Sequence, residues 1–87
     1  MKTYQGIVTK IKIIRFDSQP LVYFRIDQQD FLIAHHSLNF LADVSIDSHI
    51  AVAFTTNKKH QRIVRKYGVI GQTQLMQDFK NLSYSGV

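Results

Sequence analysis

Two apolar runs separated by a short polar link constrain the fold of this chain more than any other feature. Residues 21–27 alternate apolar and polar side chains, residues 30–35 form a second apolar run, and Gln28-Gln29 lies between them. Alternation with a period of two is typical of β-strands that bury one face. Because the link is short, the two runs predict an antiparallel β-hairpin.

A loop at Gln28-Gln29 would place Asp27 opposite Asp30 and Ile26 opposite Phe31. In that register the inner face of the hairpin consists of Val22, Phe24, Ile26, Phe31 and Ile33. The outer face carries Tyr23, Arg25, Leu32 and Ala34. The link lacks the Asn-Gly pair that tight hairpins favour. A slip of one residue would turn the second strand over and put Phe31 and Ile33 outside.

A long run rich in β-branched residues, Tyr4–Phe16, precedes the hairpin. At about 3.3 Å per residue it would span roughly 43 Å, too long for one flat strand in a small domain. We therefore expect the strand to bend, at Gly6 and at Ile13-Ile14. After the hairpin, the pattern predicts a short helical turn over residues 38–42 capped by Ser37.

Two more strands follow, over residues 50–55 and 62–70, joined by a polar loop. From Gly71 the apolar residues fall at helical spacing, which predicts a short helix over residues 74–82. Its apolar side chains are Leu75, Met76, Phe79 and Leu82. We expect residues 1–70 to form a barrel and residues 71–87 a helical tail. The tail either packs on the barrel or presents its apolar side to a protein partner or a second copy of the chain.

The order strand, strand, strand, short helix, strand, strand resembles the OB-fold, a five-stranded Greek-key barrel. The resemblance covers residues 2–70 and concerns the order of elements, since the chain has no cold-shock-type aromatic box and no Gly-rich RNA-binding signature. An SH3-like barrel is the alternative, and the helix between the third and fourth strands favours the OB-fold. The resemblance implies that oligonucleotides or oligosaccharides bind on the second and third strands and on the 1–2 and 4–5 loops.

The charge balance points to a polyanionic partner. Eleven Lys and Arg residues stand against six acids, all of them Asp, which gives a net charge of +5. Such a charge suits nucleic acid, although it also keeps a small protein soluble. Cations neutralise phosphates and an exposed Tyr stacks on a base. The candidate nucleic-acid-binding residues are Lys10, Lys12, Tyr23, Arg25, Lys58, Lys59, Arg62, Arg65 and Lys66. We expect a protein that binds single-stranded DNA or RNA; a protein-interaction or assembly module is the alternative.

No catalytic or metal-binding pattern stands out. The chain has no Cys, and the adjacent His35 and His36 would point to opposite faces of a strand. The remaining histidines are His49 and His60. Asp27 and Asp30 fall at the expected exposed tip of the hairpin, where they would not form an acid–base pair in a cleft. We therefore expect no enzyme, no metal and no cofactor.

The apolar runs are short. None approaches the roughly 20 residues that span a bilayer, and the N-terminal residues contain no long apolar segment typical of a secretory signal. These features predict a soluble, cytoplasmic protein that does not bind membranes.

Overall fold

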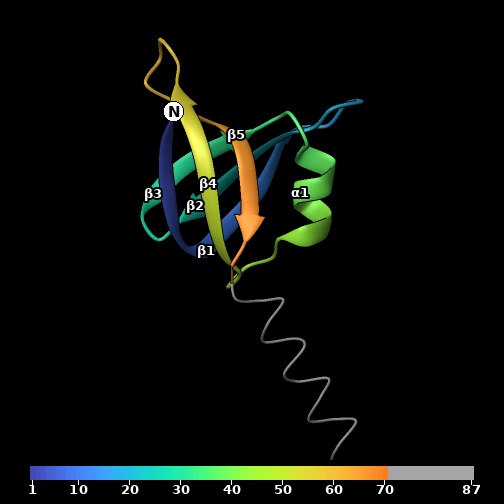
Figure 1. Cartoon of the computed structure of the whole chain (residues 1–87). Coiled ribbons are helices and arrows are strands. Elements are labelled where there is room, and N and C mark those ends of the chain that lie inside the picture. The colour runs from blue at the N-terminus through green and yellow to red at the C-terminus, as the bar shows by residue number, and fades with distance from the viewer. Residues whose placement is uncertain (71–87) are drawn as a thin grey trace, which may run out of the picture.

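The computed structural model describes residues 1–70 of the chain, which contain five strands and one helix. In chain order they are β1 (Lys2–Arg15), β2 (Leu21–Ile26), β3 (Gln29–Ile33), α1 (Ser37–Asp43), β4 (His49–Thr56) and β5 (Arg62–Val69). The strands close into a barrel in the order β1-β2-β3-β5-β4, and β4 pairs with β1 (Figure 1). The β3–β5 pair is parallel and the others are antiparallel. The predicted OB-like Greek-key barrel is confirmed. The predicted C-terminal helix lies outside the described residues.

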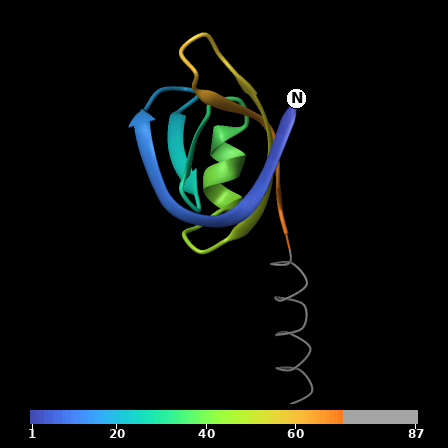
Figure 2. The same cartoon turned by 90° about the vertical axis from the view of Figure 1, so that its left-hand side faces the viewer.

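The long strand β1 curves around the barrel and contributes to both halves of the sheet (Figure 2). Its residues 2–7 pair with β4, and its residues 8–15 pair with β2. The register shifts between Val8 and Lys10 and again between Ile13 and Arg15. The predicted irregularity at Ile13-Ile14 is therefore confirmed. The second irregularity of β1 lies at Thr9, and not at Gly6 as predicted. At this interruption of the ladder the Thr9 hydroxyl donates a hydrogen bond of 3.2 Å to the carbonyl oxygen of Asp27.

Gly6 has a different role, since it lets the tip of the β2–β3 hairpin lie against β1. The Asp27 carboxylate accepts hydrogen bonds from the Tyr4 hydroxyl at 3.1 Å and from the Ile7 amide at 3.2 Å. A Cβ on Gly6 would overlap Oδ2 of Asp27 and would lie 2.8 Å from Cγ2 of Ile26. The glycine is thus required by a close approach of two segments.

The β2–β3 hairpin turns one residue earlier than predicted, at Asp27-Gln28. Ile26 pairs with Gln29 and Arg25 pairs with Asp30, so the predicted pairing of Asp27 with Asp30 is wrong. Asp27 has a φ of 54°, and its carboxylate is held by β1, which places the turn there. Each β2 residue pairs with a β3 residue two positions earlier than expected. Because side chains alternate with a period of two, this even shift leaves the faces unchanged.

The core fills the barrel with the side chains that the alternation predicted. The Phe24 ring stacks on Phe31 at 5.5 Å and lies 4.4 Å from Phe40, which α1 contributes where it lies across one end of the barrel (Figure 2). The buried apolar residues are Val8, Val22, Phe24, Ile26, Phe31, Ile33, Phe40, Val44, Ile50, Val52, Phe54 and Val64. All five residues predicted for the inner face of the hairpin are among them.

The start of α1 differs from the prediction. Ser37 is the first helical residue and not the cap, because the chain turns at His36, which has a φ of 65°. Ser37 is buried, and its hydroxyl has no hydrogen-bond partner among residues 1–70. The other end of the helix is tied to β5, where the Tyr67 hydroxyl donates to Asp43 at 2.8 Å.

Candidate functional site

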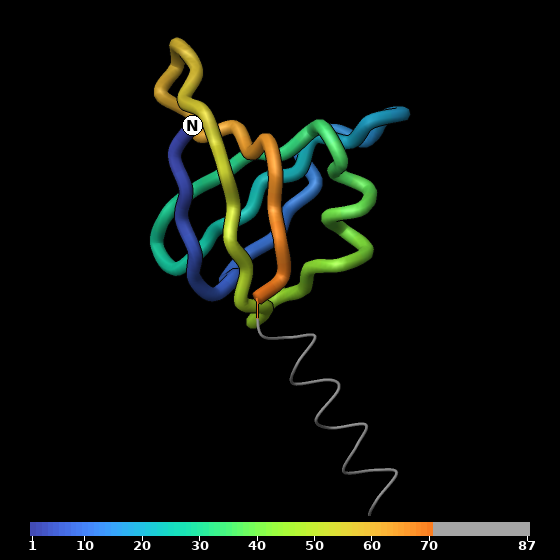
Figure 3. The backbone as a smooth tube through the Cα atoms, viewed as in Figure 1, coloured from blue at the N-terminus to red at the C-terminus, as the bar shows by residue number. Residues whose placement is uncertain are grey.

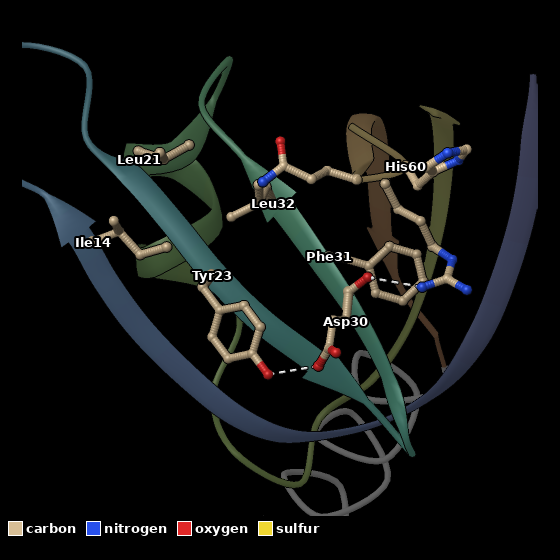
Figure 4. A pocket seen from close by; sticks show the side chains of 9 residues that line it. Ile14, Leu21, Tyr23, Asp30, Phe31, Leu32 and His60 are labelled. Atoms are coloured by element: carbon tan, nitrogen blue, oxygen red, sulfur yellow. Dashed lines mark hydrogen bonds between the residues drawn. The ribbon is translucent and has the colours of Figure 1, made fainter. Parts of the chain in front are cut away.

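A groove lies on the outer face of β2 and β3, between the β1–β2 loop and the β4–β5 hairpin. Both of these loops project from the barrel (Figure 3). The groove has a volume of about 480 Å³. Its lining residues are Ile14, Leu21, Tyr23, Asp30, Phe31, Leu32, His60, Gln61 and Arg62 (Figure 4). Strands remote in sequence thus share one concave surface that combines apolar, aromatic and charged side chains.

Asp30 connects the polar side chains of the groove. Its Oδ1 accepts a hydrogen bond of 2.6 Å from the Tyr23 hydroxyl (Figure 4). The same oxygen accepts a hydrogen bond of 3.0 Å from Nε of Arg25. Its carbonyl oxygen accepts a third bond, of 3.3 Å, from Arg62. Asp30 therefore lies on the outer face of β3 among candidate binding residues, and not at the hairpin tip as predicted. The predicted register hid this contact. A hairpin turn at Asp27-Gln28 would have placed Arg25 opposite Asp30 and predicted the ion pair from the sequence.

These contacts set the protonation states in the groove. Hydrogen bonds from Tyr23 and then Arg25 hold the pKa of the Asp30 carboxyl below its ordinary value. The hydrogen bond between Tyr23 and Asp30 also raises the pKa of the Tyr23 hydroxyl above its ordinary value of 10.0. At neutral pH the groove therefore contains an ionised carboxylate and a neutral phenol whose ring is held in place.

Several predicted cations lie near the aromatic rings of the groove. Nζ of Lys10 lies 5.9 Å from the centroid of the Tyr23 ring, within the range of a cation–π contact. Lys12 is the β1 residue that pairs with Tyr23. The Arg62 guanidinium lies 5.7 Å from the Phe31 ring centroid. The structure thus brings Lys10, Lys12 and Arg25 to the face that carries Tyr23, and it places Arg62 beside the Phe31 ring of the same groove.

Lys58 and Lys59 lie at the tip of the β4–β5 hairpin, which a side-chain network holds in shape. Oδ1 of Asn57 accepts hydrogen bonds from the amides of Lys59 at 2.9 Å and Gln61 at 3.0 Å. His60 has a φ of 63°, as expected for the left-handed residue of a three-residue hairpin loop. Both lysines are exposed, and the loop continues directly into the groove through His60 and Gln61.

Arg65 and Lys66 lie apart from the groove. Within the described part of the chain a single pair, Leu32 with Ile63, joins β3 to β5, and β5 then continues along β4. Lys66 pairs with Ala53, and Nε of Arg65 donates to the Thr55 hydroxyl at 3.1 Å. These two cations therefore belong to the outer surface of β4 and β5.

The sequence interpretation did not include the apolar side chains at the end of β1 among the site residues. Ile13, Ile14 and Phe16, here called the apolar loop cluster, are exposed, and Phe16 is 80% exposed. Ile14 and Leu21 line the end of the groove that adjoins this cluster. Three apolar residues among the four positions before Asp17 were the available signal.

The histidines are arranged differently from the prediction. The chain leaves β3 before His35 and turns at His36, so the two rings lie together with centroids 3.9 Å apart instead of on opposite faces of a strand. Among residues 1–70, no group of three or more His, Cys, Asp or Glu side chains could hold a metal ion.

Comparison with protein-family models, curated proteins and solved structures found no match to this chain. None of the helices within residues 1–70 has the length and apolar character needed to cross a membrane. The chemistry of the groove is therefore the basis for assigning a function.

Proposed function

We propose that this protein binds single-stranded nucleic acid, without catalysis, along the groove on β2 and β3. One observation carries the proposal: the apolar groove that holds the Tyr23 ring is flanked by cations of β1 and of the β4–β5 hairpin. Unpaired bases need an apolar or aromatic surface, whereas phosphates need positive charge nearby. A groove that offers both along one path matches a single strand better than it matches a duplex, whose bases are stacked inside.

Tyr23 is the stacking residue of this proposal. Its ring is half-buried and its hydroxyl is bound to Asp30, so little side-chain freedom remains to be lost when a base stacks on it. Stacking of a base on an aromatic side chain contributes roughly 1–3 kcal/mol. Phe16, exposed and two residues after the groove residue Ile14, is a second aromatic side chain available to a longer strand.

The phosphates would be neutralised by Lys10 and Lys12 on one side and by Lys58, Lys59 and Arg62 on the other. These cations come from β1 and from the β4–β5 hairpin, and thus flank the groove. Each neutralised phosphate releases counterions, so the affinity should fall with salt by roughly 0.7 log units per contact and per log unit of salt for a single strand.

Fluorescence anisotropy with labelled single-stranded DNA and RNA at several salt concentrations tests the proposal. We expect binding that weakens linearly on a log–log plot against salt. Tyr23→Ala should weaken binding to all sequences, whereas Tyr23→Phe, which keeps the ring, should retain most of the affinity. Lys10→Ala with Lys12→Ala should flatten the salt slope more than Arg65→Ala with Lys66→Ala, a matched loss of two charges outside the groove. A lack of binding at about 50 mM salt would contradict the proposal.

A protein-interaction or assembly role is the second candidate, and the apolar loop cluster favours it. Three exposed apolar residues within four positions of the chain are typical of a contact surface. The tail residues Leu75, Met76, Phe79 and Leu82 supply a further apolar set. Light scattering of the full chain, of a Phe16→Ser variant and of a chain ending at Gly71 separates these sources. A dimer that either change dissociates would support the role, and a monomeric full chain would contradict self-assembly.

A further inference from the structure

Asp30 places a negative charge in the middle of a surface that is otherwise cationic. Its side chain is 54% exposed, so it is available to a ligand in the groove. One oxygen, Oδ1, accepts the bonds from Tyr23 and Arg25. The other oxygen, Oδ2, has no hydrogen-bond partner among residues 1–70. A carboxylate repels phosphates, so its contribution to binding must come from accepting hydrogen bonds from the ligand.

The position of the Asp30 carboxylate relative to Tyr23 determines which part of a stacked base it can contact. Asp30 and Tyr23 project from neighbouring strands, and Oδ1 lies 2.6 Å from the Tyr23 hydroxyl oxygen. The carboxylate therefore lies just beyond the rim of the ring (Figure 4). A base stacked on that ring would direct one edge towards the carboxylate. Bases in single strands are commonly identified by such edge contacts while they stack on aromatic side chains.

The donors on the base edges differ. Guanine offers two adjacent donors, N1–H and the N2 amino group, on its Watson–Crick edge. Adenine and cytosine offer one amino group beside a ring nitrogen acceptor, and thymine offers N3–H between two carbonyl oxygens. An ionised carboxylate attracts adjacent donors and repels adjacent acceptors. Guanine is therefore the base whose edge best complements Asp30.

We propose that Asp30 selects guanine at the Tyr23 position, so that the groove binds guanine-containing single strands in preference to others. The proposal rests on the function proposed above and adds a base preference to it. Arg25 and Tyr23 act as positioning residues, because they fix the carboxylate through Oδ1 and leave Oδ2 for the base. We expect the guanine preference at one position of the bound strand, since one carboxylate contacts one base.

The test uses short DNA strands that contain thymine at every position except the central one, which is varied. A single guanine in a thymine strand avoids the self-association of guanine-rich strands. The central base is guanine, adenine, cytosine, thymine or hypoxanthine, the base of inosine. The affinity of the full chain for each strand is measured by fluorescence anisotropy. A hydrogen bond to a charged group contributes about tenfold in affinity. We expect the guanine strand to bind about tenfold tighter than the all-thymine strand. Inosine, which lacks the N2 amino group, should lie between them.

The variant Asp30→Asn removes the charge and should abolish the ratio between guanine and thymine strands, even though its affinity for all strands rises. Asp30→Ala should abolish the ratio as well. Asp47→Asn is the matched control, because it removes the same charge far from the groove, and Asn tolerates its φ of 76°. This control should keep the ratio of the unmodified protein.

The outcomes separate the two proposals. Equal binding of all five strands by the unmodified protein would overturn the guanine preference and leave the proposed function intact. A guanine preference that persists in Asp30→Asn and Asp30→Ala would also overturn the role of Asp30. If neither these DNA strands nor the labelled RNA of the first test bind, the proposed function itself fails, and the base preference fails with it.

Discussion

Tyr23 and Asp30 are joined across the β2–β3 ladder by a hydrogen bond of 2.6 Å from the phenol to the carboxylate. Arg25 binds the same carboxylate oxygen at 3.0 Å. The arrangement holds an aromatic ring and a negative charge in fixed positions within the groove. Both the stacking and the base preference proposed above depend on that geometry, so its consequences in solution can be tested without a ligand.

The first prediction concerns the protonation of Asp30. The Tyr23 hydrogen bond is the largest cause that lowers the pKa of this carboxyl below 3.8. Tyr23→Phe should therefore raise the Asp30 pKa towards that value. The folded state gains from Asp30 above pH 3.8, and the gain disappears as the pH falls through the lowered pKa. NMR titration of the Asp30 carboxyl carbon measures the change. An unaltered midpoint in Tyr23→Phe would show that the bond does not persist in solution.

The second prediction concerns stability at high pH. Burial, together with the hydrogen bond to Asp43, raises the pKa of Tyr67 from 10.0 to about 12. Because the folded state holds this proton more tightly, Tyr67 stabilises the fold fully below pH 10.0, and the contribution is lost as the pH rises towards 12. Chemical denaturation at several pH values should show stability falling across this window. Tyr67→Phe should remove most of that dependence, and an equally steep fall in the variant would contradict the assignment.

The third prediction concerns the close approach at Gly6. Gly6→Ala should destabilise the protein by about 1–3 kcal/mol, because the methyl group would overlap the side chains of Asp27 and Ile26. Gly68→Ala is the matched control, since among the described residues only Gly68 and its two chain neighbours have atoms within 4 Å of a Cβ placed there. The control should be neutral or slightly stabilising. Thermal unfolding of both variants measures the difference, which should vanish if the hairpin tip is free in solution.

The fourth prediction concerns the contact of α1 with the barrel. Phe40 is fully buried and its ring lies 4.4 Å from Phe24. Phe40→Ala should cost about 3–5 kcal/mol of stability through lost burial and the remaining cavity. Leu38, on the same helix, is 59% exposed, and Leu38→Ala should change stability by less than about 0.5 kcal/mol. Similar losses in the two variants would contradict the observed orientation of α1.

The alternation along the chain predicted the fold well because it is a local property. Phe24 and Ile26 alternate with Tyr23 and Arg25, and any β-strand with one buried face separates these two sets. The inner face of the hairpin, the bending of β1 and the helix between the third and fourth strands followed from the sequence patterns. The hairpin register did not, because the turn depends on Asp27, which contacts Ile7 in a segment distant in sequence.

The sequence by itself determined which side chains face the core and that an excess of cations remains outside. Only the tertiary structure decided how these cations are divided. It places Lys10 and Lys12 beside Tyr23 and Arg62 beside Phe31, and it leaves Arg65 and Lys66 on another surface, because β5 leaves β3 after Ile63 and follows β4. It also placed Asp30 beside Tyr23. Such neighbours depend on which strands pair and in which register, and those long-range contacts are not encoded in the period of any single strand.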